Sequence, residues 1–195
     1  LLACAIRPSQ LPDNHLIFAS SDMLKLALVK YNYGGLMTLN HVPKLSKDNP
    51  TGCCPRFNPK DWDGKTFEFK NKPFVRVISH SFFYMPLDLG KMMTKTWATI
   101  TATGADSKDE FIMLSYDVSP WKCEHFLSVT KAVPGLENVK MTGRFKTKVF
   151  EGPYQDAPKW IKAMNTKNKV YLYYTTCPKC QKVYGKNYVV ALAQL

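Results

Sequence analysis

Two segments of the chain, residues 82–97 and 149–164, align without a gap and follow the same pattern. Each contains the end of a strand, a proline turn, an acidic candidate for a helix N-cap and the start of an amphipathic helix. The acidic residues are Asp88 and Asp156. Identical residues align at Phe83 and Phe150, Pro86 and Pro153, and Lys95 and Lys162. An internal repeat constrains the fold strongly, because both copies are expected to form the same unit.

The segments that follow the two helix starts also match. Residues 111–133 and 170–195 each contain two short runs rich in β-branched and aromatic residues, bounded by turn residues. The chain therefore predicts tandem β-α-β-β repeats, an α+β fold with an antiparallel sheet and helices on one face. Residues around the CPKC motif at Cys177 are predicted to form the longer tip of the second hairpin. Chance similarity is the alternative, and the shared order of elements argues against it.

The first part of the chain differs from the rest. Residues 16–35 predict a short helix that ends at Gly34-Gly35, and a polar, proline-containing linker follows it. We therefore expect residues 1–50 to be an N-terminal extension of undetermined role and residues 51–195 to be one small-molecule-binding domain.

Charge narrows the classes of partner. The chain has a formal net charge of +12, and residues 157–195 contain seven lysines and no acidic residue. Such a surface is compatible with nucleic acid or anionic lipid. The excess is mostly lysine, without a nucleic-acid-binding motif, so nucleic acid is not favoured. No stretch reaches the roughly 18 apolar residues of a membrane helix. We expect a cytoplasmic protein with no membrane partner, and the oligomeric state is not predicted.

The six cysteines include a C-x-x-C motif and an adjacent pair. Together, Cys53, Cys54, Cys177 and Cys180 could close a tetrahedral structural zinc site. Adjacent cysteines are awkward ligands because their side chains diverge, so unligated thiols and a disulfide remain open. A redox pair is less favoured, because no thioredoxin-like helix is expected after Cys177 and the nearby lysines would merely lower its thiol pKa. No cofactor is required for the chemistry.

Four segments carry a resemblance to a known group of proteins. They are "CCPRFNPKDWDGKTFEFKNKPF", "SFFYMPLDLGKMM", "KVFEGPYQDAPKWIKAM" and "YYTTCPKCQKVYGKNYVVALAQ". Together they resemble small bacterial and archaeal proteins labelled "hydrolase", which are similar to the GyrI-like, bacterial effector-binding-domain superfamily. The resemblance covers residues 53–194, and the second helix here is shorter than relatives lead us to expect.

The resemblance implies a fold of two β-α-β-β repeats and a cleft between them that binds planar or cationic aromatic compounds. Some similar proteins hydrolyse strained, alkylating natural products. For this chain it implies binding, and potentially hydrolysis, of a reactive or cationic aromatic molecule. The competing hypotheses are a non-catalytic sequestering or regulatory module, and macromolecule binding through the basic face.

Glu151 is the most informative acidic residue, because it interrupts an apolar run at a strand end. Its counterpart in the repeat is Tyr84, which predicts that the two lie across one cleft as catalytic candidates. A carboxylate among aromatic rings suits acid–base chemistry or pairing with a cation. The alternative is an exposed glutamate paired with a lysine. The predicted ligand-binding aromatics, which are alternatively core residues, are Tyr116, Trp121, Tyr154, Tyr171 and Tyr173.

Overall fold

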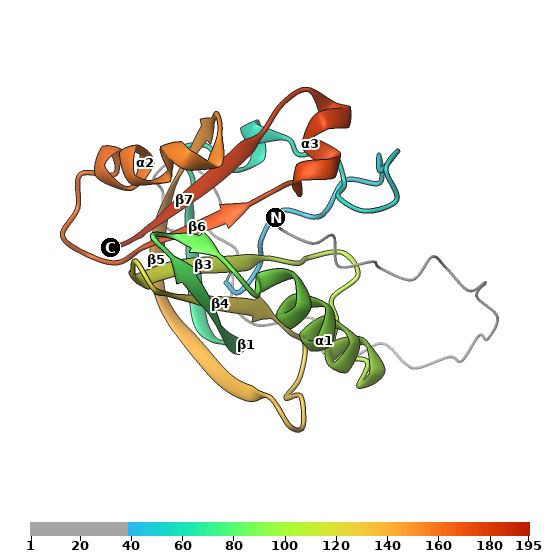
Figure 1. Ribbon diagram of the computed structural model, residues 1–195. Helices are drawn as coiled ribbons and strands as arrows, with labels where there is room; N and C mark the ends of the chain where they lie inside the picture. Colours follow the sequence, from blue (N-terminus) through green and yellow to red (C-terminus); the bar gives the residue numbers. More distant parts are fainter. Residues whose placement is uncertain (1–38) are drawn as a thin grey trace, which may run out of the picture.

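Six antiparallel strands close into a barrel in the computed structural model, which describes residues 39–195 (Figure 1). Around the barrel the order is β1 (Thr66–Phe82), β4 (Lys122–Ser128), β3 (Met113–Ser119), β6 (Val170–Tyr174), β7 (Tyr188–Gln194) and β5 (Glu137–Glu151). β5 pairs back onto β1 and closes the ring. A short strand, β2 (Met85–Pro86), pairs with the end of β1. The helix predicted within residues 16–35 lies outside the described residues.

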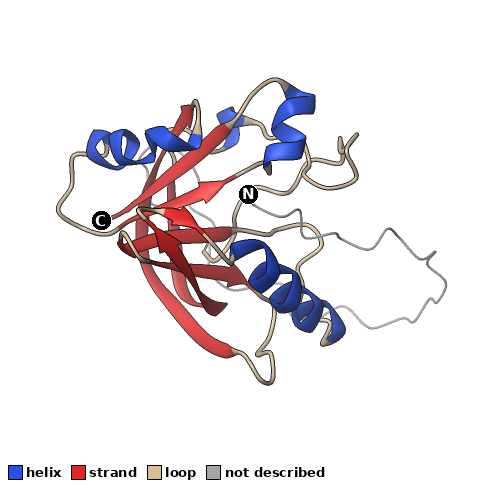
Figure 2. Ribbon diagram, in the orientation of Figure 1, coloured by secondary structure: helices blue, strands red, loops and turns tan. Residues whose placement is uncertain are grey.

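Two helices, α1 (Leu89–Ala102) and α2 (Ala157–Ala163), pack against the outside of the barrel (Figure 2). A third, α3 (Pro178–Tyr184), lies in the connection between β6 and β7, and two single 3-10 turns, η1 (Pro59–Asp61) and η2 (Tyr154–Asp156), complete the described elements. Trp97 of α1 packs in one cluster with Val75 and Leu127 of the barrel wall. Trp160 of α2 packs in another with Leu172 and Val189. No helix within residues 39–195 is long and apolar enough to cross a bilayer.

The barrel interior is the main core. Alternate residues along each strand point inward, as the two-residue period of a strand requires. The inward set includes Phe69, Phe74, Leu114, Phe145 and Leu192, each at most 2% exposed. Burying each of these side chains contributes roughly 1.5–3 kcal/mol of transfer free energy. This core fixes the strand register and therefore the position of every residue at the barrel ends.

The α+β class and the antiparallel pairing are confirmed, whereas the closure into a barrel was not predicted. β1 has 17 residues and β5 has 15, so each is long enough to curve around the core. β1 pairs with β5 over Thr66–Arg76 and with β4 over Phe74–His80. A register shift between Phe69 and Lys72 marks the bend. The order strand, helix, strand, strand occurs in the first half as β1, α1, β3 and β4, with β2 added after β1, whereas the second half has α3 between its last two strands, β6 and β7. The tandem-repeat relation itself stays a prediction.

One local conformation was not predicted. The segment after Cys177 connects the antiparallel strands β6 and β7, as expected of the second hairpin, but it forms the helix α3. Pro178 occupies the first turn, and Gly185 ends the helix in the left-handed conformation with φ 67°. A proline at the start and a glycine just past the end are the usual boundaries of a helix. Val183 and Tyr184 between them favour a strand, and the two boundary signals outweigh that preference.

Candidate functional site

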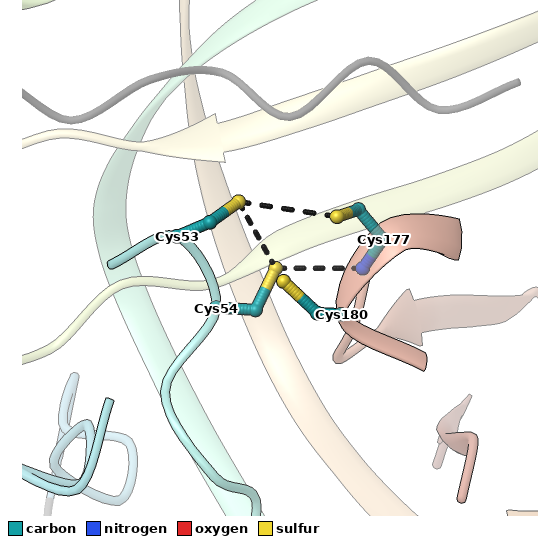
Figure 3. A group of neighbouring side chains, drawn as sticks. All are labelled: Cys53, Cys54, Cys177 and Cys180. Carbon is teal, nitrogen blue, oxygen red and sulfur yellow. Dashed lines mark hydrogen bonds between the residues drawn. The ribbon is translucent and has the colours of Figure 1, made fainter. Parts of the chain in front are cut away.

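Four cysteines from two distant segments meet beside α3 (Figure 3). Cys53 and Cys54 lie in the loop before η1, Cys177 precedes α3, and Cys180 lies in its first turn. Their four Sγ atoms all lie within 4.8 Å of one another. The predicted group of four cysteines is therefore brought together by the fold.

The sulfur separations suit a tetrahedral metal site. A zinc ion bound at about 2.3 Å by four thiolates places the sulfurs about 3.8 Å apart. The Sγ atom of Cys53 is 3.6 Å from that of Cys54 and 3.9 Å from that of Cys177. We expected the side chains of the adjacent pair to diverge, and this was wrong, since both point into the cluster (Figure 3).

Hydrogen bonds join the two segments around the cluster. The backbone N–H of Cys177 donates to Cys54 Sγ at 3.4 Å. The thiol of Cys180 donates to Thr51 Oγ1 at 3.2 Å. The hydroxyl of Tyr184 donates to the carbonyl oxygen of Cys54 at 2.5 Å. Contacts of this kind orient metal ligands in known sites.

The cluster is shielded from solvent, with Cys177 6% and Cys180 2% exposed. Burial raises the pKa of Cys54 to about 12. Burial alone would also raise the pKa of Cys180, but hydrogen bonding with Thr51 and the neighbouring cysteines holds it below its usual range. Cys54, Cys177 and Cys180 are free thiols, whereas Cys53 is disulfide-bonded. All four can therefore serve as metal ligands together only in the reduced protein.

A helix of seven residues follows Cys177, so the absence of a helix is not what argues against a redox pair. What favours a metal is instead the full donor set. Two more sulfurs stand within 4.8 Å of the C-x-x-C pair, which is the arrangement of a four-thiolate site.

Glu151 lies at the end of β5. Its Cα pairs with that of Tyr188 on β7, and its side chain is 51% exposed. The ammonium group of Lys186 lies 3.9 Å from the Glu151 carboxylate. The Phe57 ring packs against Tyr188, with 5.7 Å between the ring centroids. A carboxylate, an ammonium group and two rings therefore share this end of the barrel.

The backbone around Glu151 is held in place by Asn187. The N–H of Gly152 donates to the Asn187 carbonyl at 3.1 Å, and the Asn187 side chain donates to the Gly152 carbonyl at 2.6 Å. Phe57, Lys186 and Tyr188 were missed as site residues. Phe57 does belong to the CCPRF motif, but only the β5–β7 register shows which strand residue faces Glu151.

The other predicted site residues are distributed over several places. Tyr171 and Tyr173 are each 7% exposed and belong to the barrel core. Tyr116 packs on Tyr171, with 5.6 Å between ring centroids. The Tyr154 hydroxyl donates to the Thr176 carbonyl at 2.5 Å, next to Cys177. Their ligand-binding role stays a prediction.

Tyr84 and Trp121 lie elsewhere, at the turn between β1 and β2 and the turn between β3 and β4. The N–H of Tyr84 donates to the Pro120 carbonyl at 2.9 Å. Within residues 39–195, Tyr84 and Glu151 therefore have separate neighbours, and the cleft predicted between them stays a prediction. A hollow of about 440 Å³ does lie on the surface, lined by His41, Val42, Pro43, Lys44, Phe67 and Glu110.

A buried histidine lies in the wall of the barrel. His125 of β4 is 3% exposed and lies between two serines. Its Nε2 is 2.8 Å from Ser79 Oγ, and its Nδ1 is 2.9 Å from Ser115 Oγ. Burial lowers the pKa of His125 to about 4. The imidazole is therefore neutral at pH 7, and both ring nitrogens have hydroxyl partners.

Residues 44–195 match the model of a protein family described as "Bacterial hydrolase". No curated protein matches the chain. The matched range contains all four clustered cysteines and Glu151.

Proposed function

Because the chain belongs to the bacterial hydrolase family, we propose that its domain binds a cationic or aromatic small molecule beside Glu151. A structural zinc ion at the four cysteines holds this surface in shape. The observation that carries the proposal is the approach of all four Sγ atoms to within 4.8 Å. The loop of Cys53 and Cys54 continues to Phe57, whose ring packs against Tyr188 with 5.7 Å between the ring centroids.

The zinc ion is structural because four thiolates complete its coordination and leave no open position for water or substrate. The ion would link the Cys53-Cys54 loop to α3. The distance from Cys54 to Phe57 is only three residues, so the metal also positions the Phe57 ring. Hydrolytic chemistry, in contrast, needs a group that can activate water, and Glu151 is the acidic residue at this surface.

The groups around Glu151 suit an aromatic cation. The carboxylate supplies a negative charge, and the faces of Tyr188 and Phe57 supply stacking and cation–π attraction. Lys186 is the native cation at this place, lying 3.9 Å from Glu151 and 5.9 Å from the centroid of the Tyr188 ring. A bound cationic ligand would displace that ammonium group.

Hydrolysis would use the same carboxylate as a general base. Glu151 accepts a proton from water as the water oxygen bonds to the electrophilic carbon of the ligand. The bond from that carbon to its leaving group breaks, and the proton then passes to the leaving group. Non-catalytic binding is the second candidate. The half-exposed, lysine-paired state of Glu151 favours it, because a cation-binding carboxylate needs no further activation.

Replacing Glu151 by Gln is expected to weaken binding of ethidium, a cationic aromatic dye, by about tenfold. The substitution removes the charge but keeps the size and leaves both rings in place. Fluorescence titration of the purified protein measures the dissociation constant. A hydrolysable electrophilic probe added to the same variants tests turnover, which Glu151→Gln should abolish.

The matched control is Glu68→Gln, which removes a carboxylate from β1 and leaves the ring pair intact. If both substitutions weakened ethidium binding equally, binding would depend on the overall charge of the protein, and the Glu151 site would be rejected. Unchanged binding by Glu151→Gln would also reject it.

A further inference from the structure

A second surface, away from Glu151, exposes an unusual number of large apolar side chains. It comprises the β1–β2 turn, the chain leading into α1 and the β3–β4 turn, and we call it the aromatic tip. Its members are Phe82, Phe83, Tyr84, Met85, Leu87 and Trp121, with exposed fractions between 50% and 72%. Monomeric proteins rarely leave a contiguous patch of this kind without a binding role.

The aromatic tip is preformed. The rings of Phe82, Phe83 and Trp121 pack on one another, with centroid separations of 4.9, 5.5 and 4.9 Å. Phe83 and Tyr84 adopt positive φ angles of 47° and 66°. Glycine or asparagine is the residue that normally occupies such turns. Two bulky aromatic residues are held there instead, and their rings are directed to solvent.

Basic residues surround the aromatic tip. Lys91 and Lys95 are exposed, one helical turn apart in the first half of α1. Lys122 follows Trp121 directly, and its ammonium group lies 3.9 Å from the Glu124 carboxylate. The nearby carboxylate of Asp88 is already engaged, 2.9 Å from the ring of His80. With a chain charge of +12, this neighbourhood favours an anionic partner.

We propose that the aromatic tip inserts into the headgroup region of an anionic lipid bilayer, as a peripheral membrane contact. Tryptophan, tyrosine and phenylalanine are the residue types that membrane interfaces favour, since their rings are apolar and their polar atoms remain hydrated. Lysines next to them are attracted to anionic headgroups. Small-molecule sites are concave, whereas this tip is formed by two turns whose side chains project outward.

No membrane partner was expected from the sequence, because no stretch could span a bilayer. A peripheral contact needs no spanning stretch, only exposed apolar groups and charge of the right sign. The proposal is independent of the ligand site at Glu151, because the two surfaces have separate residues.

Tryptophan fluorescence provides a direct test in the full chain. Of the four tryptophans, Trp62, Trp97 and Trp160 are at most 7% exposed, whereas Trp121 is 50% exposed. Burial of the tip therefore changes the Trp121 signal selectively. With vesicles of phosphatidylcholine and phosphatidylglycerol, we expect a blue shift and co-sedimentation of the protein. Phosphatidylcholine vesicles alone, or high salt, should weaken both effects.

The double substitution Phe83→Ser and Tyr84→Ser should reduce partitioning into anionic vesicles by about tenfold or more, because two inserted rings are lost. Lys91→Glu with Lys95→Glu should also reduce it. Val183→Ser is the matched control, since Val183 of α3 is 65% exposed but lies outside the tip. Circular dichroism confirms that each variant folds.

Three outcomes would overturn the proposal. The first is an unchanged Trp121 signal with both kinds of vesicle. The second is a blue shift that appears without lipid and increases with protein concentration, which would identify the tip as a contact between two copies of the chain. The third is an equal loss of vesicle binding in Val183→Ser and in the double tip variant.

Discussion

Withdrawing zinc from the reduced, zinc-loaded protein is expected to lower its free energy of unfolding by about 4 kcal/mol. This is the linkage free energy for a ligand present at about a thousandfold excess over its dissociation constant. For a domain of this size the loss corresponds to a decrease in Tm of roughly 10 °C. Scanning calorimetry with and without a chelator measures it, in the presence of a reductant because Cys53 is otherwise disulfide-bonded.

The cysteine variants separate metal loss from loss of packing. Cys180→Ser should abolish the response to the chelator, because one of four ligands is lost. Cys123→Ser is the matched control, since Cys123 is also a buried free thiol but lies on β4, outside the cluster. It should keep the full response and bind one zinc ion per chain. A response that persists in Cys180→Ser would contradict the four-cysteine site.

Acidification from pH 7 to about pH 4 is expected to destabilise the fold by about 3 kcal/mol through His125 alone. Burial lowers the pKa of this histidine from 6.5 to about 4. Between about pH 4 and pH 6.5, His125 therefore binds a proton in the unfolded chain but not in the folded chain. The stabilisation by neutral His125 is therefore complete above about pH 6.5 and is lost as the pH falls toward 4.

Denaturant titrations at pH 7 and pH 5 measure this effect as a difference between variants. His125→Asn lacks the titrating group, so its pH dependence should be flatter than that of the native protein. The contribution of Asp117 to the pH dependence cancels in this comparison, because burial raises the pKa of that carboxyl in both proteins. Parallel curves for the two proteins would show that His125 does not control acid stability.

Local patterns predicted most of the elements. The strands β3, β4, β6 and β7 follow from short runs of β-branched and aromatic residues. Asp88 and Asp156 occupy the N-cap positions of α1 and α2, as predicted, but neither side chain makes the capping hydrogen bond. The closure of the barrel could not be predicted in this way, because the pairing of β1 with β5 depends on the length and curvature of strands far apart in sequence.

The candidate site could also be predicted only in part. The four cysteines were predicted as a group because cysteine is scarce and chemically distinctive, so few residues compete for a role. Tyr188 was not predicted as the neighbour of Glu151. Its position depends on the β5–β7 register, and a shift of one residue would turn its ring to the other face of the sheet.

The pairing of β1 with β5 has a kinetic consequence. The ladder joins residues near 66–76 to residues near 137–146, so the contacts that close the barrel are distant in sequence. High contact order slows folding, because the intervening chain must be ordered before such contacts form. The β3–β4 hairpin is local and can form early, whereas closure must wait until β5 is in place. The chain therefore folds slowly for its size, and the unpaired edges of β1 and β5 are its most aggregation-prone surfaces until they meet.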